Sequence, residues 1–292
     1  MKNQILYRMF QYSAVIICLL FVVGYCTAEA IGAERIVSLG PINTENVYLL
    51  GAGDRLVGNT SYCVRPEAAK QKEKIGSVMQ VSIEKIISLQ PDLVLATALT
   101  RQEHVEQLQN LGFEVIRFNQ PASFAEICAQ FIRLGRLLDL EKEANKIVRQ
   151  ARDEVEILKK KIINLPEQKV LLQVGSQPLF GSVKNSFTHD FIVMGGGINI
   201  THDQRSGRTD SEKVIAHNPD VIIIAIMGSE TGIAAQEQGK WQRIPVLKAA
   251  RDDRVHVINP DLVCSPSPTT FTQTLRIIAG LIHTEIAMEN DQ

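Results

Sequence analysis

The sequence contains few of the residues and little of the charge that are typical of nucleic-acid-binding and metal-binding proteins. It has one Trp, six His and five Cys in 292 residues, and its formal net charge is −1. A near-neutral chain lacks the basic surface that nucleic acid requires, so no nucleic acid is expected as a partner. The histidines show no paired placement and converge with no carboxylates in the sequence. A metal site draws on several such ligands, and we expect neither a protein-held metal nor a resident cofactor.

Catalytic fingerprints are also missing. The sequence has no Walker loop and no nucleophile elbow. Its glycine cluster, Gly195-Gly196-Gly197, follows a predicted helix rather than a strand, which is not the dinucleotide-binding arrangement. These absences favour a binding protein over an enzyme.

A long apolar run occurs only near the start of the chain. Residues 14–23 are apolar or small after a basic start, and Ala28-Glu29-Ala30 offers the small-residue pattern of a cleavage site. The run is shorter than the about 20 apolar residues of a spanning helix. Residues 1–30 are therefore predicted to be a signal peptide, and the protein is expected in the periplasm. Lipid attachment at Cys26 is the alternative, although Tyr25 stands where lipoprotein signals need a small residue.

Beyond residue 30, short runs rich in Val and Ile alternate with amphipathic stretches of helical length. Continuous apolar strands alternating with helices predict an α/β fold whose parallel sheets are covered on both faces. The predicted strands are 35–39, 56–59, 92–96, 114–118, 169–174, 220–225 and 254–258. The predicted helices are 44–50, 83–89, 102–111, 124–138, 187–194, 211–217, 241–249 and 269–283.

A segment of different composition lies in the middle of the chain. Residues 140–163 are rich in Glu, Lys, Arg and Gln and contain no Gly or Pro. Ile147, Ala151, Val155 and Leu158 recur at helical spacing and form one apolar stripe. The segment is predicted to be one long helix, either a stiff connection between two lobes or a surface helix within one domain.

An internal repeat favours the connection between two lobes. The nine residues from Glu84 to Asp92 read EKIISLQPD, and those from Glu212 to Asp220 read EKVIAHNPD. Each copy predicts a short helix, a Pro that ends it, and a buried strand, with Ser82 and Ser211 as expected helix caps. We therefore predict an N-terminal lobe over 31–139, a connecting helix over 140–163 and a C-terminal lobe over 164–292.

Several short motifs, taken together in their order and spacing, resemble those of a known protein family. They include Arg35-Ile36-Val37-Ser38-Leu39-Gly40-Pro41, the two repeat copies, and Gly195-Gly196-Gly197-Ile198-Asn199. The chain resembles the periplasmic binding proteins of the vitamin B12, ferric siderophore and haem uptake systems. The resemblance implies two Rossmann-like lobes joined by one long helix, with a ligand cleft between them.

The same resemblance implies a function in transport. The chain is expected to capture a metal chelate, cobalamin or a ferric siderophore, and to deliver it to an ABC importer. The alternatives are a haem-binding protein of the same transport class and a signalling or adhesion lobe that no longer serves transport. The implied partners are the chelate and the permease dimer in the membrane, and the protein itself is expected to be a monomer.

Two residues are implicated in docking by the resemblance. In this family one exposed Glu of each lobe engages Arg residues of the transporter, and Glu84 and Glu212 match those positions. Both are also ordinary first-turn acids, which the helix dipole stabilises by about 0.3–1 kcal/mol. The two interpretations are compatible, because a Glu at a helix start is both stable and exposed.

The ligand is expected at loops that follow the strands, between the lobes. Tyr62 and Phe180 match positions where relatives that bind vitamin B12 place an aromatic side chain against the ligand. Those relatives also present Trp side chains, whereas segments 76–80 and 96–100 occupy the corresponding loops here without Trp. The candidate ligand-binding residues are Asn43, Tyr62, Arg65, Phe180, Arg208 and Asp261.

Three cysteines follow the predicted signal peptide. Cys63 and Cys264 are both expected at the cleft, where they either form a disulfide between the lobes or offer thiolates to a ligand metal. The alternative is that they are two unrelated small buried residues. Cys128 falls on one helix face with Phe124 and Phe131, so it is predicted to pack in the core.

Overall fold

The computed structural model describes residues 32–227 and 232–289. The predicted signal peptide over 1–30, including Cys26, lies outside the described residues. In the part of the chain that is described, no helix is both long and apolar enough to cross a membrane.

The first lobe is built on a five-stranded sheet in which every strand pair is parallel. In spatial order its strands are β3 (Glu73–Lys74), β2 (Leu56–Asn59), β1 (Ile36–Ser38), β4 (Leu93–Thr97) and β5 (Val115–Phe118). Its helices are α2 (Pro41–Leu49), α3 (Ile83–Leu89), α4 (Gln102–Asn110) and α5 (Phe124–Leu137). Two short 3-10 turns, Gly53–Arg55 and Glu67–Gln71, complete the lobe.

The second lobe is built on a mixed sheet. Its strands β10 (Val255–Val257), β9 (Val221–Ile224), β6 (Gln168–Ser176) and β7 (Leu179–Gly181) lie in that order, and β8 (Gly197–Asn199) also pairs with β6. All pairs are parallel except β6 with β7. Its helices are α7 (Phe187–Met194), α8 (Ser211–His217), α9 (Ile233–Gln242), α10 (Lys248–Arg251), α11 (Pro260–Cys264), α12 (Pro268–Ile282) and α13 (Thr284–Glu289).

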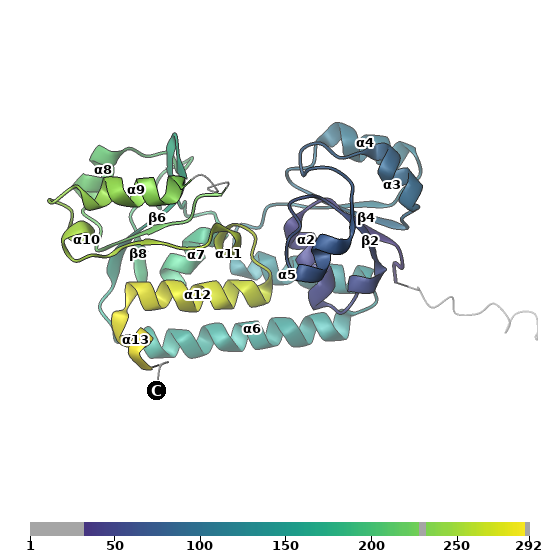
Figure 1. Ribbon diagram of the computed structural model, residues 1–292. Helices are drawn as coiled ribbons and strands as arrows, with labels where there is room; N and C mark the ends of the chain where they lie inside the picture. Colours follow the sequence, from purple (N-terminus) through teal and green to yellow (C-terminus); the bar gives the residue numbers. More distant parts are fainter. Residues whose placement is uncertain (1–31, 228–231, 290–292) are drawn as a thin grey trace, which may run out of the picture. The chain divides into compact units, whose positions relative to one another are not determined.

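Helix α6 (Glu141–Ile162) connects the two lobes in the sequence and runs beneath both of them (Figure 1). It has 22 residues, which corresponds to about 33 Å at 1.5 Å per residue. The stripe predicted from the sequence is its buried face, since Ala151, Val155 and Leu158 are each at most 5% exposed. This face packs on α5 of the first lobe and α12 of the second.

One continuous hydrophobic core therefore runs under both sheets. It joins Ile36 and Leu95 of the first sheet to Val170 and Ile223 of the second through the buried faces of α5, α6, α7 and α12. Two smaller clusters fill the opposite faces of the sheets, one beneath α3 and α4 and the other beneath α8 and α9. Both faces of each sheet are covered, as the sequence predicts.

Aromatic side chains connect the lobes at the centre of this core. The ring of Phe271 in α12 stacks on Phe124 of α5 at 4.5 Å and on Phe191 of α7 at 4.3 Å. Next to the stack, Asp190 Oδ2 accepts a hydrogen bond of 2.7 Å from the backbone amide of Phe124. These contacts fix the start of α5 against the second lobe.

Some predicted elements are wrong in position or direction. The predicted helix 241–249 is two helices, because α9 ends at Gln242 and Pro245 disfavours helical backbone at the residue before it. Helix α2 begins at Pro41, three residues before the predicted start. Strands β3, β7 and β8, which have two or three residues each, are not predicted from the sequence, and the antiparallel β7 makes the second sheet mixed rather than parallel.

Candidate ligand cleft

A cavity of about 310 Å³ opens between the two lobes at the carboxyl ends of β4, β5 and β9. This edge of the sheets is where the sequence predicts the ligand. From the first lobe it is lined by Pro41, Ile42, Tyr62, Ser77, Val78, Met79, Thr97, Ala98, Leu99, Phe118, Asn119, Gln120, Pro121 and Gln130. The second lobe contributes Phe187, Met227, Cys264, Ser265 and Pro266.

The described part of the lining is uncharged. Among the described residues that line the cavity there is no Asp, Glu, Lys, Arg or His. Apolar and sulfur-containing side chains dominate, with hydroxyl and amide groups from residues such as Ser77, Asn119 and Gln130. Such a surface suits a ligand that is itself largely apolar and carries neutral polar substituents, because a buried charge would find no partner here.

Tyr62 lines the cavity, and of the six candidate ligand-binding residues it is the one found there. Its side chain is 60% exposed, so the ring is available to a ligand. Asn43 instead lies buried behind the wall, where its Nδ2 donates to the carbonyl oxygens of Leu95 and Ala96 at 3.3 and 3.1 Å. Its amide supports the end of β4 rather than the cavity surface.

Arg65 belongs to a polar network that joins the lobes. Its Nη2 lies 3.0 Å from Glu45 Oε2 and donates to the carbonyl oxygen of Ser265 in the second lobe. Glu45, which is 8% exposed, also accepts hydrogen bonds from the hydroxyls of Ser267 and Thr270. The guanidinium therefore holds the loop that contains Ser265, and it lines a separate inter-lobe hollow rather than the cleft.

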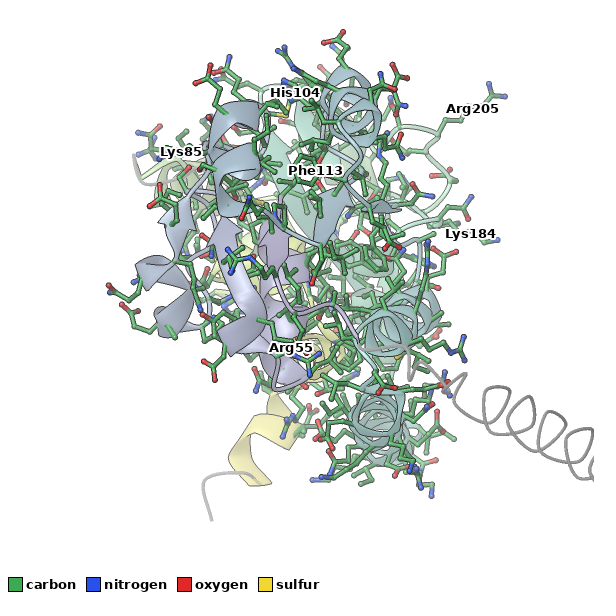
Figure 2. The ribbon with its side chains drawn as sticks, turned by 90° about the vertical axis from the view of Figure 1, so that its right-hand side faces the viewer. Arg55, Lys85, His104, Phe113, Lys184 and Arg205 are labelled. Atoms are coloured by element: carbon green, nitrogen blue, oxygen red, sulfur yellow. The ribbon has the colours of Figure 1, made fainter. Side chains whose placement is uncertain are left out.

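The three remaining candidates lie elsewhere in the second lobe. Phe180 is a half-buried residue of β7 that forms an isolated bridge with Arg208, whose side chain is exposed. Asp261 lies in the first turn of α11, where its amide donates to Asn259 Oδ1. The neighbouring Arg205 projects into solvent (Figure 2).

Cys63 and Cys264 are free thiols in the structure, so the hypothesis of a disulfide between the lobes is wrong for this structure. Cys63 is fully buried within the first lobe, where its Sγ lies 3.2 Å from the hydroxyls of Thr44 and Thr60. Cys264 lines the cleft, and burial raises the pKa of its thiol to about 11. A thiol of that pKa is protonated at neutral pH and is a poor metal ligand.

Cys128 is a core residue, as predicted, and Trp241 is another. Cys128 is fully buried in α5, and Trp241 is 3% exposed, with its Nε1 donating to Gln173 Oε1 at 2.8 Å. Within residues 32–227 and 232–289, no cluster of three or more His, Cys, Asp or Glu side chains could hold a metal ion.

Most of the cleft-lining side chains are not predicted from the sequence. Met79 and Leu99 lie in the two loops recognised as lacking Trp, while Phe118 and Asn119 lie where β5 ends. The end of a predicted parallel strand is a signal that could have found the latter pair. The same signal could have found Met227, which follows β9. Phe187 carries no such signal, because it lies at the start of a helix and reaches the cleft through the packing of one lobe against the other.

Glu84 and Glu212 occupy matching places on α3 and α8, in the first turn of each helix, and both are exposed. The neighbouring lysines are already engaged, Lys85 with Glu73 at 2.6 Å and Lys213 with Asp210 at 3.3 Å. Among the described residues neither carboxylate has a hydrogen-bond or ion-pair partner, so both are free to bind another molecule.

The helix caps of the two repeats differ from one another. Ser82 caps α3, as predicted, through a 3.3 Å hydrogen bond from the amide of Lys85. The predicted cap Ser211 is wrong, since Asp210 caps α8 through a 2.9 Å hydrogen bond from the amide of Lys213. Both helices end in the left-handed conformation, at Gln90 and Asn218, one residue before the Pro.

Comparison with known proteins agrees with the architecture. The family model described as periplasmic binding protein matches residues 36–262. An uncharacterised ABC transporter substrate-binding lipoprotein, YvrC of Bacillus subtilis, is 31% identical over 80% of this chain and 76% of its own length. The vitamin B12-binding protein of Yersinia pseudotuberculosis is 31% identical over 70% of this chain and 73% of its own length.

A solved structure gives the same result for the fold. The periplasmic haem-binding protein RhuT from Roseiflexus superposes with a TM-score of 0.74 and is 25% identical. The match covers 87% of this chain and all of that one.

Proposed function

The chain belongs to the periplasmic binding protein family, and we propose that it captures a neutral metal chelate outside the cytoplasmic membrane and delivers it to an ABC importer. Cobalamin is the first candidate and a neutral ferric siderophore the second. The metal arrives inside the ligand, so the proposal needs no cofactor held by the protein.

The uncharged cleft is the observation that carries the choice of ligand. Haem brings two propionates and ferric catecholates bring a net negative charge, and burying such groups without a counter-charge is costly. Among the described lining residues none supplies that counter-charge. Cobalamin carries amide substituents on a largely apolar ring system, which match the amides and hydroxyls of a mainly apolar lining.

Isothermal titration of the purified protein tests this choice. The panel contains cyanocobalamin, a neutral ferric hydroxamate, an anionic ferric catecholate and haemin. We expect cyanocobalamin or the hydroxamate to bind at least about tenfold more tightly than either anion, since that ratio requires only about 1.4 kcal/mol. Tighter binding of haemin would contradict the proposal and favour the haem-binding alternative, with Tyr62 as its axial ligand.

Delivery to the importer is the second part of the proposal. The unpaired carboxylates of Glu84 and Glu212 support docking to basic side chains of a permease dimer, one subunit for each lobe. Exposed ion pairs add little affinity singly, but two at a fixed separation would set orientation and association rate. We propose that the binding protein itself acts as a monomer.

Export is the third part. The predicted signal over 1–30 and the lipoprotein relative support either cleavage after residue 30 or a lipid on Cys26. Mass analysis of the protein recovered from an exporting host separates the two outcomes. A free N-terminus at residue 31 indicates a soluble periplasmic form, and an acylated Cys26 indicates an anchored form.

A further inference from the structure

Arg117, in β5, forms an unusually complete set of hydrogen bonds with one loop. Its Nη2 donates to the carbonyl oxygens of Ala98 at 2.9 Å and Thr100 at 3.1 Å. Its Nε donates to the carbonyl oxygen of Thr97 at 3.2 Å, and its Nη1 donates to Gln102 Oε1 at 2.7 Å. None of the ion pairs among the described residues involves Arg117. Its positive charge is instead stabilised by three backbone carbonyl oxygens and the side-chain amide oxygen of Gln102.

The loop that Arg117 binds is a wall of the cleft. Thr97, Ala98 and Leu99 line the cavity, and the Leu99 side chain is 62% exposed. Inside the loop, the amide of Thr97 donates to Thr100 Oγ1 at 3.0 Å and the amide of Thr100 donates to the carbonyl oxygen of Thr97. An exposed Leu has no packing of its own to hold it, so the backbone of this loop must fix its position.

The guanidinium also determines which groups of the loop face the ligand. Three carbonyl oxygens, those of Thr97, Ala98 and Thr100, point to Arg117 and are occupied there. These three acceptors are therefore already hydrogen-bonded where Thr97, Ala98 and Leu99 line the cavity. Only a planar group with several donors in a fixed arrangement can hold three carbonyls in this way.

We propose that Arg117 is a positioning residue for ligand capture, which sets the shape and the uncharged character of the Thr97–Thr100 wall without touching the ligand. This inference rests on the proposed function for its effect on affinity. It follows that Lys is a poor substitute, because a single ammonium keeps the charge but cannot reproduce the planar arrangement of several N–H donors.

The test compares Arg117→Lys with the unaltered protein in two measurements. Titration with cyanocobalamin reports affinity, and hydrogen exchange of the peptide covering residues 97–102 reports the order of the loop. We expect affinity to fall by about tenfold or more, since charge-assisted hydrogen bonds to several carbonyls are lost. The amides of Thr97, Leu99 and Thr100 should exchange faster, while residues 93–96 of β4 and the strand β5 keep their protection.

Arg136→Lys is the matched control. Arg136 is exposed at the end of α5 and pairs with Glu141 on the surface, remote from the cavity lining. This variant should retain the affinity and the loop exchange of the unaltered protein. A melting temperature for Arg117→Lys close to that of the control shows that the loop, not the fold, has changed.

Two outcomes would overturn the inference. One is unchanged loop exchange in Arg117→Lys, and the other is a general loss of protection across β4 and β5, which would make Arg117 an ordinary structural residue. If the unaltered protein does not bind cyanocobalamin, the proposed ligand fails separately. Faster exchange confined to residues 97–102 would then still support the positioning role.

Discussion

Asp92 and Asp220 hold the starts of β1 and β6 in the same way. Asp92 Oδ1 accepts a hydrogen bond from the amide of Arg35 at 3.0 Å, and Asp220 Oδ2 accepts one from the amide of Lys169 at 2.7 Å. Each Asp follows a Pro and directly precedes a strand that pairs with the one it holds. The internal repeat is thus a structural unit that ends a helix and fixes the neighbouring strand.

Replacement of these two acids should reduce stability unequally. Asp92→Ala loses hydrogen bonds to two exposed amides, and Asp220→Ala also loses the ion pair with Lys248. We expect a loss of about 1 kcal/mol for Asp92→Ala and about 2 kcal/mol for Asp220→Ala in the free energy of unfolding. Urea titration measures both, with the exposed Asp153→Ala on α6 as control. Equal effects would show that the Lys248 pair contributes no more than one amide hydrogen bond, since Asp92 accepts two of these and Asp220 one.

The repeat also explains how much of the fold the sequence predicts. Every predicted strand exists, and α3, α7 and α8 have the predicted bounds, because caps, Pro and apolar periodicity are local signals. Short strands such as β3 and β8 leave no such signal, since their two or three residues exist as strands only by pairing with β2 and β6. The position of Trp241 at the end of α9 depends on its buried contact with Gln173, which is 68 residues away.

Breaking the Arg65–Glu45 pair should destabilise the contact between the lobes. Arg65→Gln leaves the carboxylate of Glu45, whose side chain is 11% exposed, without its cationic partner. We expect a loss of about 2 kcal/mol in the free energy of unfolding, below the range for a fully buried pair because Arg65 is partly exposed. The double variant Glu45→Gln, Arg65→Gln should recover part of the loss, which thermal and urea unfolding would measure.

A surface pair provides the control for that prediction. Arg276 and Glu154 lie 3.2 Å apart with side chains 56% and 43% exposed. Arg276→Gln should cost less than about 1 kcal/mol, as exposed pairs generally do. A cost for Arg65→Gln no larger than this would mean that Ser267 and Thr270 satisfy Glu45 by themselves.

The candidate site is less predictable than the fold, for a physical reason that Arg65 and Tyr62 illustrate. Both follow β2 in the sequence, yet Tyr62 lines the cleft while Arg65 turns to Glu45 and Ser265. A sequence identifies the loops at the strand ends, but which side chains enter the cavity depends on partners elsewhere in the chain, such as Ser265, which is 200 residues from Arg65. Phe187 and Met227 belong to the cleft for the same reason.

Gly40 should be sensitive to any side chain because of its closeness to the cleft wall. A Cβ at this position would lie 2.4 Å from Thr97 Cγ2, so Gly40→Ala must displace Thr97. We expect affinity for cyanocobalamin to fall by about tenfold, equivalent to 1.4 kcal/mol, in isothermal titration. Gly239→Ala is the control, since its added Cβ meets nothing within 4 Å and Ala favours the helix. Equal affinities for the two variants would contradict the role of the Thr97 contact.

Stability should decrease on mild acidification. Burial is the largest cause that lowers the pKa values of His189, His256 and His283 below the ordinary 6.5. Below pH 6.5 the unfolded chain therefore takes up these protons before the folded protein does, and stability falls with pH. The melting temperature should be lower at pH 5.5 than at pH 7.5, and His256→Gln should reduce that difference. A melting temperature that rises on acidification would contradict this prediction.

Uptake should depend on Glu84 and Glu212 while ligand binding does not. The two carboxylates lie on separate lobes, are unpaired among the described residues and are absent from the cavity lining, so Glu84→Ala, Glu212→Ala should leave the affinity for cyanocobalamin unchanged. Transport into proteoliposomes that contain the importer should fall at least tenfold, because two ion pairs at about 1 kcal/mol each are removed together. Asp153→Ala, Glu167→Ala removes the same charge from exposed positions elsewhere and should transport normally. Normal transport by the first variant would exclude docking through these residues and would favour a lobe that recognises its partner elsewhere.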